Sequence, residues 1–302
     1  MLLLVFMSAE VNKTGVPESE PDEMGGKKLP EDRRGVSVSL DGKTIRSTGK
    51  MDSYDSPLHI VSAQRCELGI TLASKSVDGK SNEIPAVQEL LKELDISGCM
   101  IVADALNCQK KTAKTVVSGK GDYLLSVKSN QETLEADIED YVQDPGLRKT
   151  MDTSIQKEKN RGRIETRTAF ATDDIAWLSG RQAWPGLCCI GAIHTECEEK
   201  GKKTSQWHYY ISSRKLTALE LLHHARMEWT VESMHWLLDV HFGEDFCRIE
   251  DKTVQQNLNI LRKFALSIIK TFKQKTLSSD LSHIMFDCLL DPGFLCALCR
   301  EN

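Results

Sequence analysis

The spacing of apolar residues predicts several short strands in the first half of the chain. Four runs alternate or cluster as strands do: Val36 to Leu40, Leu58 to Ala63, Gly69 to Ser74 and Cys99 to Ala103. We expect the first three to form an antiparallel meander. The fourth is wholly apolar, which predicts a buried strand reached by a crossover. The first run ends directly before Asp41 and the fourth directly before Asp104.

Segments with helical spacing of apolar residues lie before and after the fourth of these strands. Apolar residues recur every three or four positions from Glu83 to Leu94, and a polar helix through Lys114 precedes a further strand, Tyr123 to Val127. A helix over Gln131 to Val142 follows. This alternation is typical of an α/β fold, in which layers of helices cover a sheet.

The composition changes after residue 147. Residues 148–215 contain basic, glycine-punctuated segments and short apolar runs such as Leu187 to Ile193 and Trp207 to Ser212, which predict a β-rich insertion. The chain then returns to three helices: Leu216 to His224, Glu228 to Val240 and Val254 to Phe272. In the last of them an apolar stripe recurs at spacings of four and three: Val254, Leu258, Leu261, Ala265, Ile268 and Phe272.

Four segments follow from these patterns. Residues 1–35 are rich in Glu, Asp, Lys, Gly and Pro without apolar periodicity, which predicts a disordered leader. Residues 36–147 would form the first part of an α/β domain and residues 148–215 its insertion. Residues 216–302 would supply the helical remainder and the C-terminal helices.

The composition argues against several classes of protein. With 302 residues, 40% of them hydrophobic, the chain can bury a substantial core. The apolar run Leu2 to Met7 is too short to span a membrane and lacks the basic flank of a secretion signal, so we expect a cytoplasmic protein. Most of the ten cysteines lie in apolar stretches, as reduced core thiols do. Cys296 and Cys299 form one CxxC without a second pair nearby, which favours apolar helix residues over zinc ligands.

The charge pattern leaves nucleic-acid binding to local patches. A net charge of −5 argues against a protein that coats nucleic acid indiscriminately, because phosphate neutralisation needs clustered Lys and Arg. Basic residues do cluster between Arg148 and Arg167 and between Lys252 and Lys275. Each cluster is interpreted either as a contact surface or as an ordinary solvated face, and charge alone favours the second.

Acidic residues at three distant positions are candidates for metal chemistry. Asp41 and Asp104 would lie side by side if the strands that precede them are neighbours in one sheet. One helix face offers further charged groups at steps of four, three and four: Glu228, Glu232, His235 and Asp239. The opposite face offers apolar residues for packing: Trp229, Trp236 and Val240. By spacing alone a solvated surface is the favoured interpretation of the charged stripe, and an Asp after a strand is most often a turn or cap residue.

The residues around these acids form four blocks with a wider resemblance. The blocks read Leu40-Asp41-Gly42-Lys43-Thr44-Ile45-Arg46, Ala103-Asp104-Ala105-Leu106-Asn107-Cys108-Gln109, Gly162-Arg163-Ile164-Glu165-Thr166-Arg167 and His235-Trp236-Leu237-Leu238-Asp239-Val240-His241-Phe242-Gly243-Glu244-Asp245. In this order and spacing they resemble the insertion-sequence DDE transposases of the H-repeat-associated protein group. The match runs from about Val36 to about Lys270, or to the end of the chain, where Phe286 to Leu298 resembles that family's closing helix.

The resemblance implies a fold and an activity. The fold would be ribonuclease H-like, with a mixed five-stranded sheet, three strands antiparallel and two parallel, flanked by helices and interrupted by the β-rich insertion before the last catalytic helix. Asp41, Asp104 and Glu232 would be the catalytic, metal-binding acids for two Mg²⁺ or Mn²⁺ ions, which prefer hard oxygen ligands. The activity would be DNA transposition: endonuclease cleavage at the transposon end, then attack of the freed 3′ hydroxyl on target DNA.

Supporting roles follow from the same blocks. Lys43, Arg46, Arg163 and Arg167 are candidate contacts to DNA phosphates, with surface solvation as the alternative. His235 is a candidate to hydrogen-bond a phosphate or to position a metal-bound water. The tryptophans of the helix face would stack on an unpaired base or pack in the core, and helical spacing favours the core.

Departures from the family pattern open an alternative. The family usually has His at Glu228, Asn at Ser233 and His at Arg161, and an anion beside a metal site weakens phosphate binding. We also expect a chain that is shortened at its start or joined there to unrelated sequence, because the family carries a helical DNA-binding region before the position of Val36. The alternatives are therefore an inactive transposase remnant that retains at most DNA or partner binding, and a plain metal-dependent nuclease.

Since transposition joins two transposon ends, we predict a homodimer assembled on double-stranded DNA.

Overall fold

The computed structural model describes residues 35–46, 57–77, 83–160, 162–276 and 280–300. The predicted leader, apart from Gly35, lies outside the described residues, as does Arg161.

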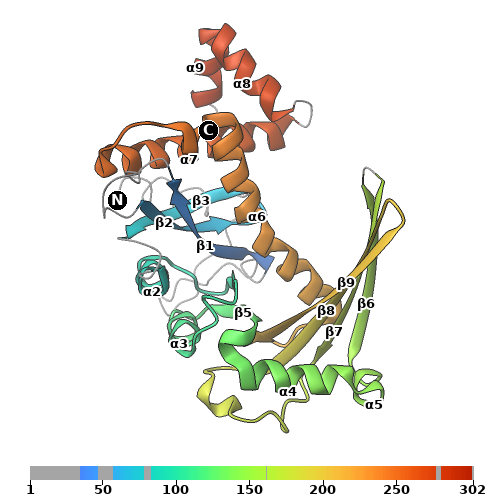
Figure 1. Ribbon diagram of the computed structural model, residues 1–302. Coiled ribbons are helices and arrows are strands. Elements are labelled where there is room, and N and C mark those ends of the chain that lie inside the picture. The colour runs from blue at the N-terminus through green and yellow to red at the C-terminus, as the bar shows by residue number, and fades with distance from the viewer. Residues whose placement is uncertain (1–34, 47–56, 78–82, 161, 277–279, 301–302) are drawn as a thin grey trace, which may run out of the picture. The chain divides into compact units, whose positions relative to one another are not determined.

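Nine strands in the described ranges hydrogen-bond in the order β3-β2-β1-β4-β5-β9-β8-β7-β6 (Figure 1). They are β1 (Ser37–Ile45), β2 (Leu58–Arg65), β3 (Ile70–Val77), β4 (Met100–Ala103), β5 (Asp122–Val127), β6 (Asp152–Asn160), β7 (Arg163–Thr172), β8 (Cys189–Glu199) and β9 (Lys202–Ser212). The chain thus has the mixed α/β architecture predicted, and β4 pairs in parallel with both β1 and β5.

The strand number differs from the five expected. The predicted insertion does form strands, β6 to β9, but β9 pairs antiparallel with β5 from Leu124↔Ser212 to Val127↔Tyr209. Because that pairing satisfies the backbone groups on the free edge of β5, the insertion continues the same sheet.

Helices fill the segments between the strands and the whole of the C-terminal part. They are α2 (Glu83–Glu93), α3 (Lys110–Ser118), α4 (Glu132–Gln143), α5 (Pro145–Arg148), α6 (Ala218–Phe242), α7 (Lys252–Thr276), α8 (Leu281–Leu290) and α9 (Pro292–Arg300). Short 3₁₀ turns are η4 (Ser129–Gln131), η5 (Arg181–Ala183) and η6 (Glu244–Phe246).

The contacts divide the chain into two compact units. The first unit holds Asp41–Ala86 and Thr230–Asn302, and the second holds Ser37–Leu40 and Val87–Trp229. The division falls inside β1, α2 and α6, so each of these elements contributes residues to both units.

The core of the second unit lies between its strands and the beginning of α6. Buried side chains of β4, β5, β7, β8 and β9 pack against Leu221, Leu222 and Ala225 of that helix. Gly191 of β8 permits the close approach, because a Cβ there would lie 2.4 Å from Cδ2 of Leu221. In this unit α4 lies beside one end of the β6–β9 strands (Figure 1).

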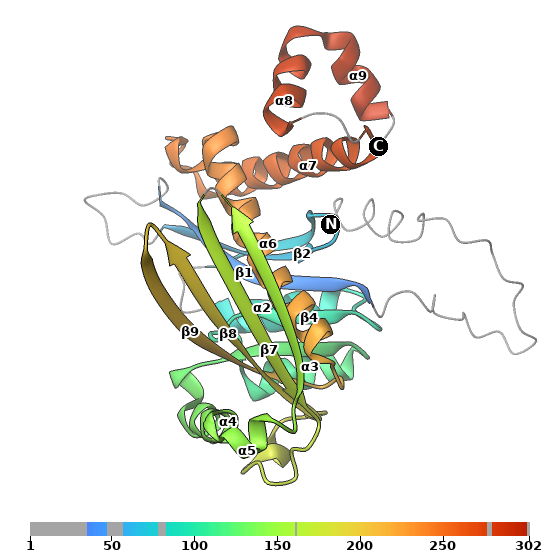
Figure 2. The same cartoon turned by 90° about the vertical axis from the view of Figure 1, so that its right-hand side faces the viewer.

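The core of the first unit is built by the C-terminal half of α6 with α7, α8 and α9. α8 and α9 lie on the same side of α7 (Figure 2), and the Phe272 and Phe294 rings meet edge to face at 5.5 Å. The closing helix expected over Phe286 to Leu298 is broken into two, because Asp291 is extended before Pro292, as a residue preceding proline prefers. In the described residues no single helix is long and apolar enough to cross a membrane, although α8 and α9 together, as a bent pair, meet the length and composition.

Two helix faces differ from the sequence prediction. On α6 the buried positions are Val231, Met234 and Leu238, whereas Trp236 is 58% exposed and Val240 is exposed as well. The face of α6 that was expected to pack therefore faces solvent. The charged stripe of Glu228, Glu232, His235 and Asp239 lies between this exposed face and the buried one.

The long helix α7 likewise buries an unexpected face. Its buried residues are Gln255, Asn259, Lys263, Leu266 and Ile269. Leu261, on the predicted apolar stripe, is 61% exposed, whereas Ile268 and Phe272 of the same stripe do pack against the core. The physical reason is that the polar side chains of this face have polar partners inside the first unit, as described below.

Candidate active site

Strand β1 does not end at Leu40 as predicted but runs on through Ile45. Successive side chains of a strand point to opposite faces, so Asp41 and Lys43 share one face of β1. Their polar contacts are made with α6 and with Glu244 of η6, while the alternate positions 42 and 44 adjoin a buried histidine–glutamate pair. The DGK block of the sequence is therefore divided between two environments.

The buried pair explains the glycine of that block. Nε2 of His59 lies 2.9 Å from Oε2 of Glu83, and both side chains are buried. Thr44 Oγ1 lies 2.8 Å from the other ring nitrogen, Nδ1 of His59. A Cβ on Gly42 would lie 2.4 Å from both Glu83 Oε2 and His59 Nε2, which real contacts essentially never allow. A side chain at position 42 would therefore displace the pair.

We expect Gly42→Ala to lower the free energy of unfolding by about 1–3 kcal/mol, the usual cost of overpacking a closed site. Urea unfolding of the variant measures the effect. Gly35→Ala is the matched control, because no atom lies within 4 Å of a Cβ at that position, just before the same strand. Equal stability of the two variants would contradict the packing argument.

Asp41 is held by a histidine of α6. Nδ1 of His235 lies 3.3 Å from Oδ2 of Asp41, and Glu232 precedes His235 by one helical turn in the same unit. Asp41 is half-buried and Glu232 exposed. The second ring nitrogen of His235, Nε2, is buried without a hydrogen-bond partner among the described residues. Such an atom marks a polar site that a water, an ion or a ligand would complete.

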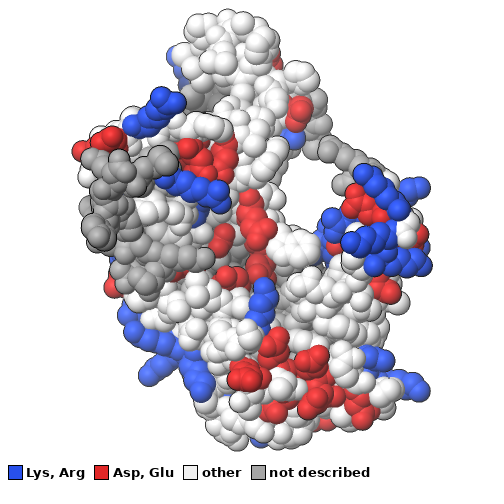
Figure 3. Space-filling view, viewed as in Figure 1, with Lys and Arg blue, Asp and Glu red and all other residues white. Residues whose placement is uncertain are grey.

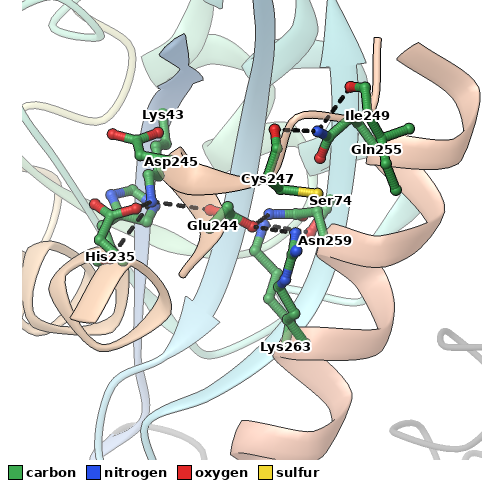
Figure 4. Close-up of polar contacts among 12 residues, drawn as sticks. Lys43, Ser74, His235, Glu244, Asp245, Cys247, Ile249, Gln255, Asn259 and Lys263 are labelled. Carbon is green, nitrogen blue, oxygen red and sulfur yellow. Dashed lines mark hydrogen bonds and ion pairs between the residues drawn. The ribbon is translucent and has the colours of Figure 1, made fainter. Parts of the chain in front are cut away.

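Lys43 contacts protein carboxylates in this structure (Figure 4). Its ammonium donates to Glu244 Oε2 at 2.9 Å and to the carboxylate of Asp239. Burial by itself would raise the pKa of Glu244, but the charge and hydrogen bond of Lys43 and a hydrogen bond from Asn259 outweigh it, and the pKa lies below its ordinary value. The sequence pattern gave no role to Glu244 or Asn259. The period of two along β1 could place Lys43 on the same face as Asp41, but it could not identify the partners of Lys43.

In the second unit, Asp104 follows β4 directly. Leu40 of β1 pairs with Ala103 of β4, so Asp41 and Asp104 are the residues that come next after a pair in register. The two strands are therefore neighbours in the sheet, which is the condition that the interpretation of the two acids required. Oδ1 of Asp104 accepts hydrogen bonds from the backbone N and from Nδ2 of Asn107, both at 3.1 Å. Burial and the nearby Asp104 carboxylate raise the pKa of Cys108 to about 12.

The predicted DNA-contacting arginines have unlike surroundings. Arg167 is only 5% exposed, because it pairs with Glu158 at 3.1 Å and Glu165 at 2.6 Å, and its guanidinium lies 5.6 Å from the ring centroid of Trp229. Arg163 is half-exposed and pairs with Glu165 at 3.4 Å. The exposed Arg46 uses its backbone N–H, which donates to Asp245. Of these three guanidinium groups, those of Arg46 and Arg163 are open to solvent.

Exposed basic residues, mixed with acidic ones, also gather at the end of the β6–β9 strands that is opposite α4 (Figure 3). They include Lys157, Lys159, Lys202 and Lys203. Lys157 and Lys159 come from the first basic cluster of the sequence, whereas Lys202 and Lys203 come from β9 and lie outside that cluster.

The candidate residues suit a hydrated divalent cation. Within the described ranges no group of three or more His, Cys, Asp or Glu side chains could hold a metal ion. Mg²⁺, however, is commonly bound by one or two carboxylates together with waters and substrate phosphates. Asp41 and Glu232 would supply such oxygens in the first unit, where Nε2 of His235 is buried without a hydrogen-bond partner among the described residues.

Comparisons with known proteins give the family. Residues 36–268 match the model of the transposase DDE domain. The chain is 33% identical over 245 residues to the putative transposase YncI of Escherichia coli O157:H7, covering 79% of this chain and 63% of that protein. It is 31% identical over 268 residues to the H repeat-associated putative transposase YhhI of Escherichia coli strain K12, covering 86% of this chain and 70% of that protein. The chain thus spans less than two thirds of YncI.

A solved structure is also similar. The piggyBac transposase synaptic complex with hairpin DNA matches with a TM-score of 0.45 and 11% identity, over 79% of this chain and 46% of that chain. The sequence comparisons, which cover most of the chain, carry the assignment. The chain therefore belongs to the insertion-sequence DDE transposase family that includes the H repeat-associated putative transposases.

Proposed function

We propose that this chain cuts DNA at transposon ends and joins the freed ends to target DNA. The observation that carries the proposal is the contact of Asp41 with His235, one helical turn from Glu232, in a member of a transposase family. The register of β1 with β4 adds Asp104 as the residue that follows the next strand. These three acids are the proposed catalytic residues.

The chain's own residues would bind and orient the reactants. Asp41, Asp104 and Glu232 would hold two divalent ions, Mg²⁺ or Mn²⁺, through carboxylate oxygens. When bound, such ions activate the attacking oxygen and stabilise the leaving one. His235 would orient the Asp41 carboxylate through Nδ1, and its Nε2 would hydrogen-bond a water or a phosphate oxygen. The exposed guanidinium groups of Arg46 and Arg163 would contact DNA phosphates.

The proposed reaction has two displacements at phosphorus. In cleavage, water attacks a phosphodiester, the bond to the 3′ oxygen breaks, and that oxygen leaves as a hydroxyl. In joining, the freed 3′ hydroxyl attacks a target phosphodiester, a new phosphodiester forms, and the target's own 3′ oxygen leaves. Each step forms one P–O bond and breaks one P–O bond at the same phosphorus: hydrolysis leaves a 5′ phosphate and a 3′ hydroxyl, and joining exchanges one phosphodiester for another. Positioning and charge stabilisation are therefore the main demands on the protein.

A strand-transfer assay tests the proposal. The substrate is a duplex that carries the inverted repeat flanking the coding sequence, incubated with supercoiled target DNA in Mg²⁺, in Mn²⁺ and in chelator. We expect metal-dependent joined products. Nicks without joined products would reduce the chain to a nuclease, and no product with either metal would favour the inactive remnant.

Light scattering with and without end DNA tests the proposed dimer, and a monomer in both states would exclude it.

A further inference from the structure

The ammonium of Lys43 is tied into the first unit at three points. It donates to Glu244 Oε2 at 2.9 Å, to the Asp239 carboxylate, and to the backbone oxygen of His235 at 3.4 Å. The side chain of Lys43 is 11% exposed and that of Glu244 0% exposed. Little of this ammonium is left for a DNA phosphate, which is the role that the sequence predicted for it.

Glu244 is itself fixed from the other side. Its second carboxylate oxygen, Oε1, accepts from Nδ2 of Asn259 at 2.8 Å (Figure 4). The same oxygen lies 3.9 Å from Nη1 of Arg262, and both Asn259 and Arg262 are on α7. The chain brings Glu244 inward because Gly243 adopts a left-handed conformation, φ 57°, directly after the end of α6. One buried carboxylate thus connects β1, through Lys43, to α7.

The location of this network gives it a specific consequence. Lys43 lies two residues after Asp41 on β1, and two of its acceptors, Asp239 and the His235 carbonyl, are on the helix that carries Glu232. A buried ion pair adds little net stability compared with an apolar pair of the same shape, but it fixes geometry, because a displaced partner leaves a buried charge unpaired. The network therefore restrains the strand of Asp41 against the helix of Glu232.

We propose that Lys43 and Glu244 form a positioning pair that sets the spacing of Asp41 and Glu232 for a divalent cation, and that Lys43 does not contact DNA. This inference rests on the proposed metal-binding role of the two acids. Lys43 and Glu244 act through those acids and touch neither the cation nor the DNA.

Separate measurements of metal binding and DNA binding test the pair. Mn²⁺ affinity is measured by electron paramagnetic resonance of free Mn²⁺, and DNA affinity is measured in chelator as a function of salt, for the wild type, Lys43→Met and Glu244→Gln. We expect both variants to bind Mn²⁺ about 10- to 100-fold more weakly, the usual effect of losing a partner that supports a metal ligand. The salt dependence of DNA affinity should be unchanged.

Controls separate positioning from folding. Asp245→Asn changes the neighbouring acid, which accepts from the backbone N–H of Arg46 and is not among the hydrogen-bond or ion-pair partners of Lys43 in the described residues. This variant should retain wild-type Mn²⁺ affinity. Lys43→Arg keeps the positive charge and should recover most of the affinity lost in Lys43→Met. A thermal melt of each variant gives its folded fraction, and the Mn²⁺ affinity is calculated for the folded protein alone. Glu244→Gln, which is nearly isosteric, supplies the test if Lys43→Met does not fold.

Two results would overturn the inference. One is wild-type Mn²⁺ affinity in the folded variants. The other is a weaker salt dependence of DNA affinity in Lys43→Met, which would show that Lys43 contacts a phosphate. In both cases the proposed function stands if Asp41→Asn abolishes Mn²⁺ binding. If the wild type binds no Mn²⁺ in an Asp41-dependent way, the proposed metal site and the positioning pair fail together.

Discussion

Asp104→Asn is expected to lower the rates of both cleavage and joining by at least about a hundredfold. Losing a residue that only supports a metal ligand costs up to about that factor, and Asp104 is proposed as a ligand itself. The amide keeps the shape of the carboxylate, and its oxygen can still accept the two hydrogen bonds from Asn107. It lacks the negative charge that a divalent cation requires of its ligand. The loss should therefore appear in the yield of nicked and joined products while the melting temperature changes little.

A second Asp provides the matched control for this substitution. Asp144 Oδ1 also accepts two local hydrogen bonds, from the backbone N of Gly146 at 2.7 Å and of Leu147 at 3.0 Å, at the beginning of α5. Asp144→Asn makes the same chemical change in a helix cap, so we expect full activity. Equal product from wild type and Asp104→Asn would remove the enzymatic proposal.

The strands that carry the candidate acids could be predicted because their sequence signal is local. The first is a short alternating run and the fourth a short apolar run, each followed by an Asp, and parallel pairing of the two strands is expected once a crossover helix lies between them. The glycine after Asp41 could be recognised as part of a family block. Its physical cause could not, because it depends on His59 and Glu83, which the fold brings to Gly42.

The helix faces were the part that sequence patterns misassigned. An apolar stripe predicts the buried face only if the buried environment is apolar, and along the first half of α7 it is not. Gln255 donates to the backbone oxygens of Cys247 and Ile249, and Asn259 donates to Glu244. These polar residues are buried because their partners come from other elements of the first unit. A periodicity count along one helix contains no information about such partners.

Lys263 is the extreme case of this buried polar face. Its ammonium donates to Ser62 Oγ at 2.6 Å and Ser74 Oγ at 3.1 Å, which joins α7 to β2 and β3. Burial lowers the pKa of Lys263 to about 7, with Glu244 opposing the shift and Lys43 adding to it. The ordinary value, 10.5, applies to the unfolded chain. Between these two pKa values the unfolded chain holds a proton that the folded protein has released.

The free energy of unfolding should therefore rise with pH from about pH 7 upward, because stability increases wherever the unfolded state binds more protons. The burial cost of the ammonium is fully present below pH 7 and is gone above the unfolded pKa. For one proton the slope is at most roughly 1.4 kcal/mol per pH unit. Lys263→Met removes the titrating group, so we expect its stability to rise less steeply than that of the wild type.

Chemical denaturation at pH 7.0, 8.0 and 9.0 measures this difference in slope. The range stops at pH 9 because burial raises the pKa of Cys108 to about 12 and of Cys189 to about 11, so these thiols ionise first in the unfolded chain and stability then falls as pH rises. Lys270, whose pKa burial lowers to about 8, contributes equally to both proteins. Lys273→Met, at an exposed lysine of the same helix, should keep the wild-type slope. Parallel pH profiles for the wild type and Lys263→Met would mean that Lys263 keeps its proton in the folded protein, held by Glu244 and the two serines.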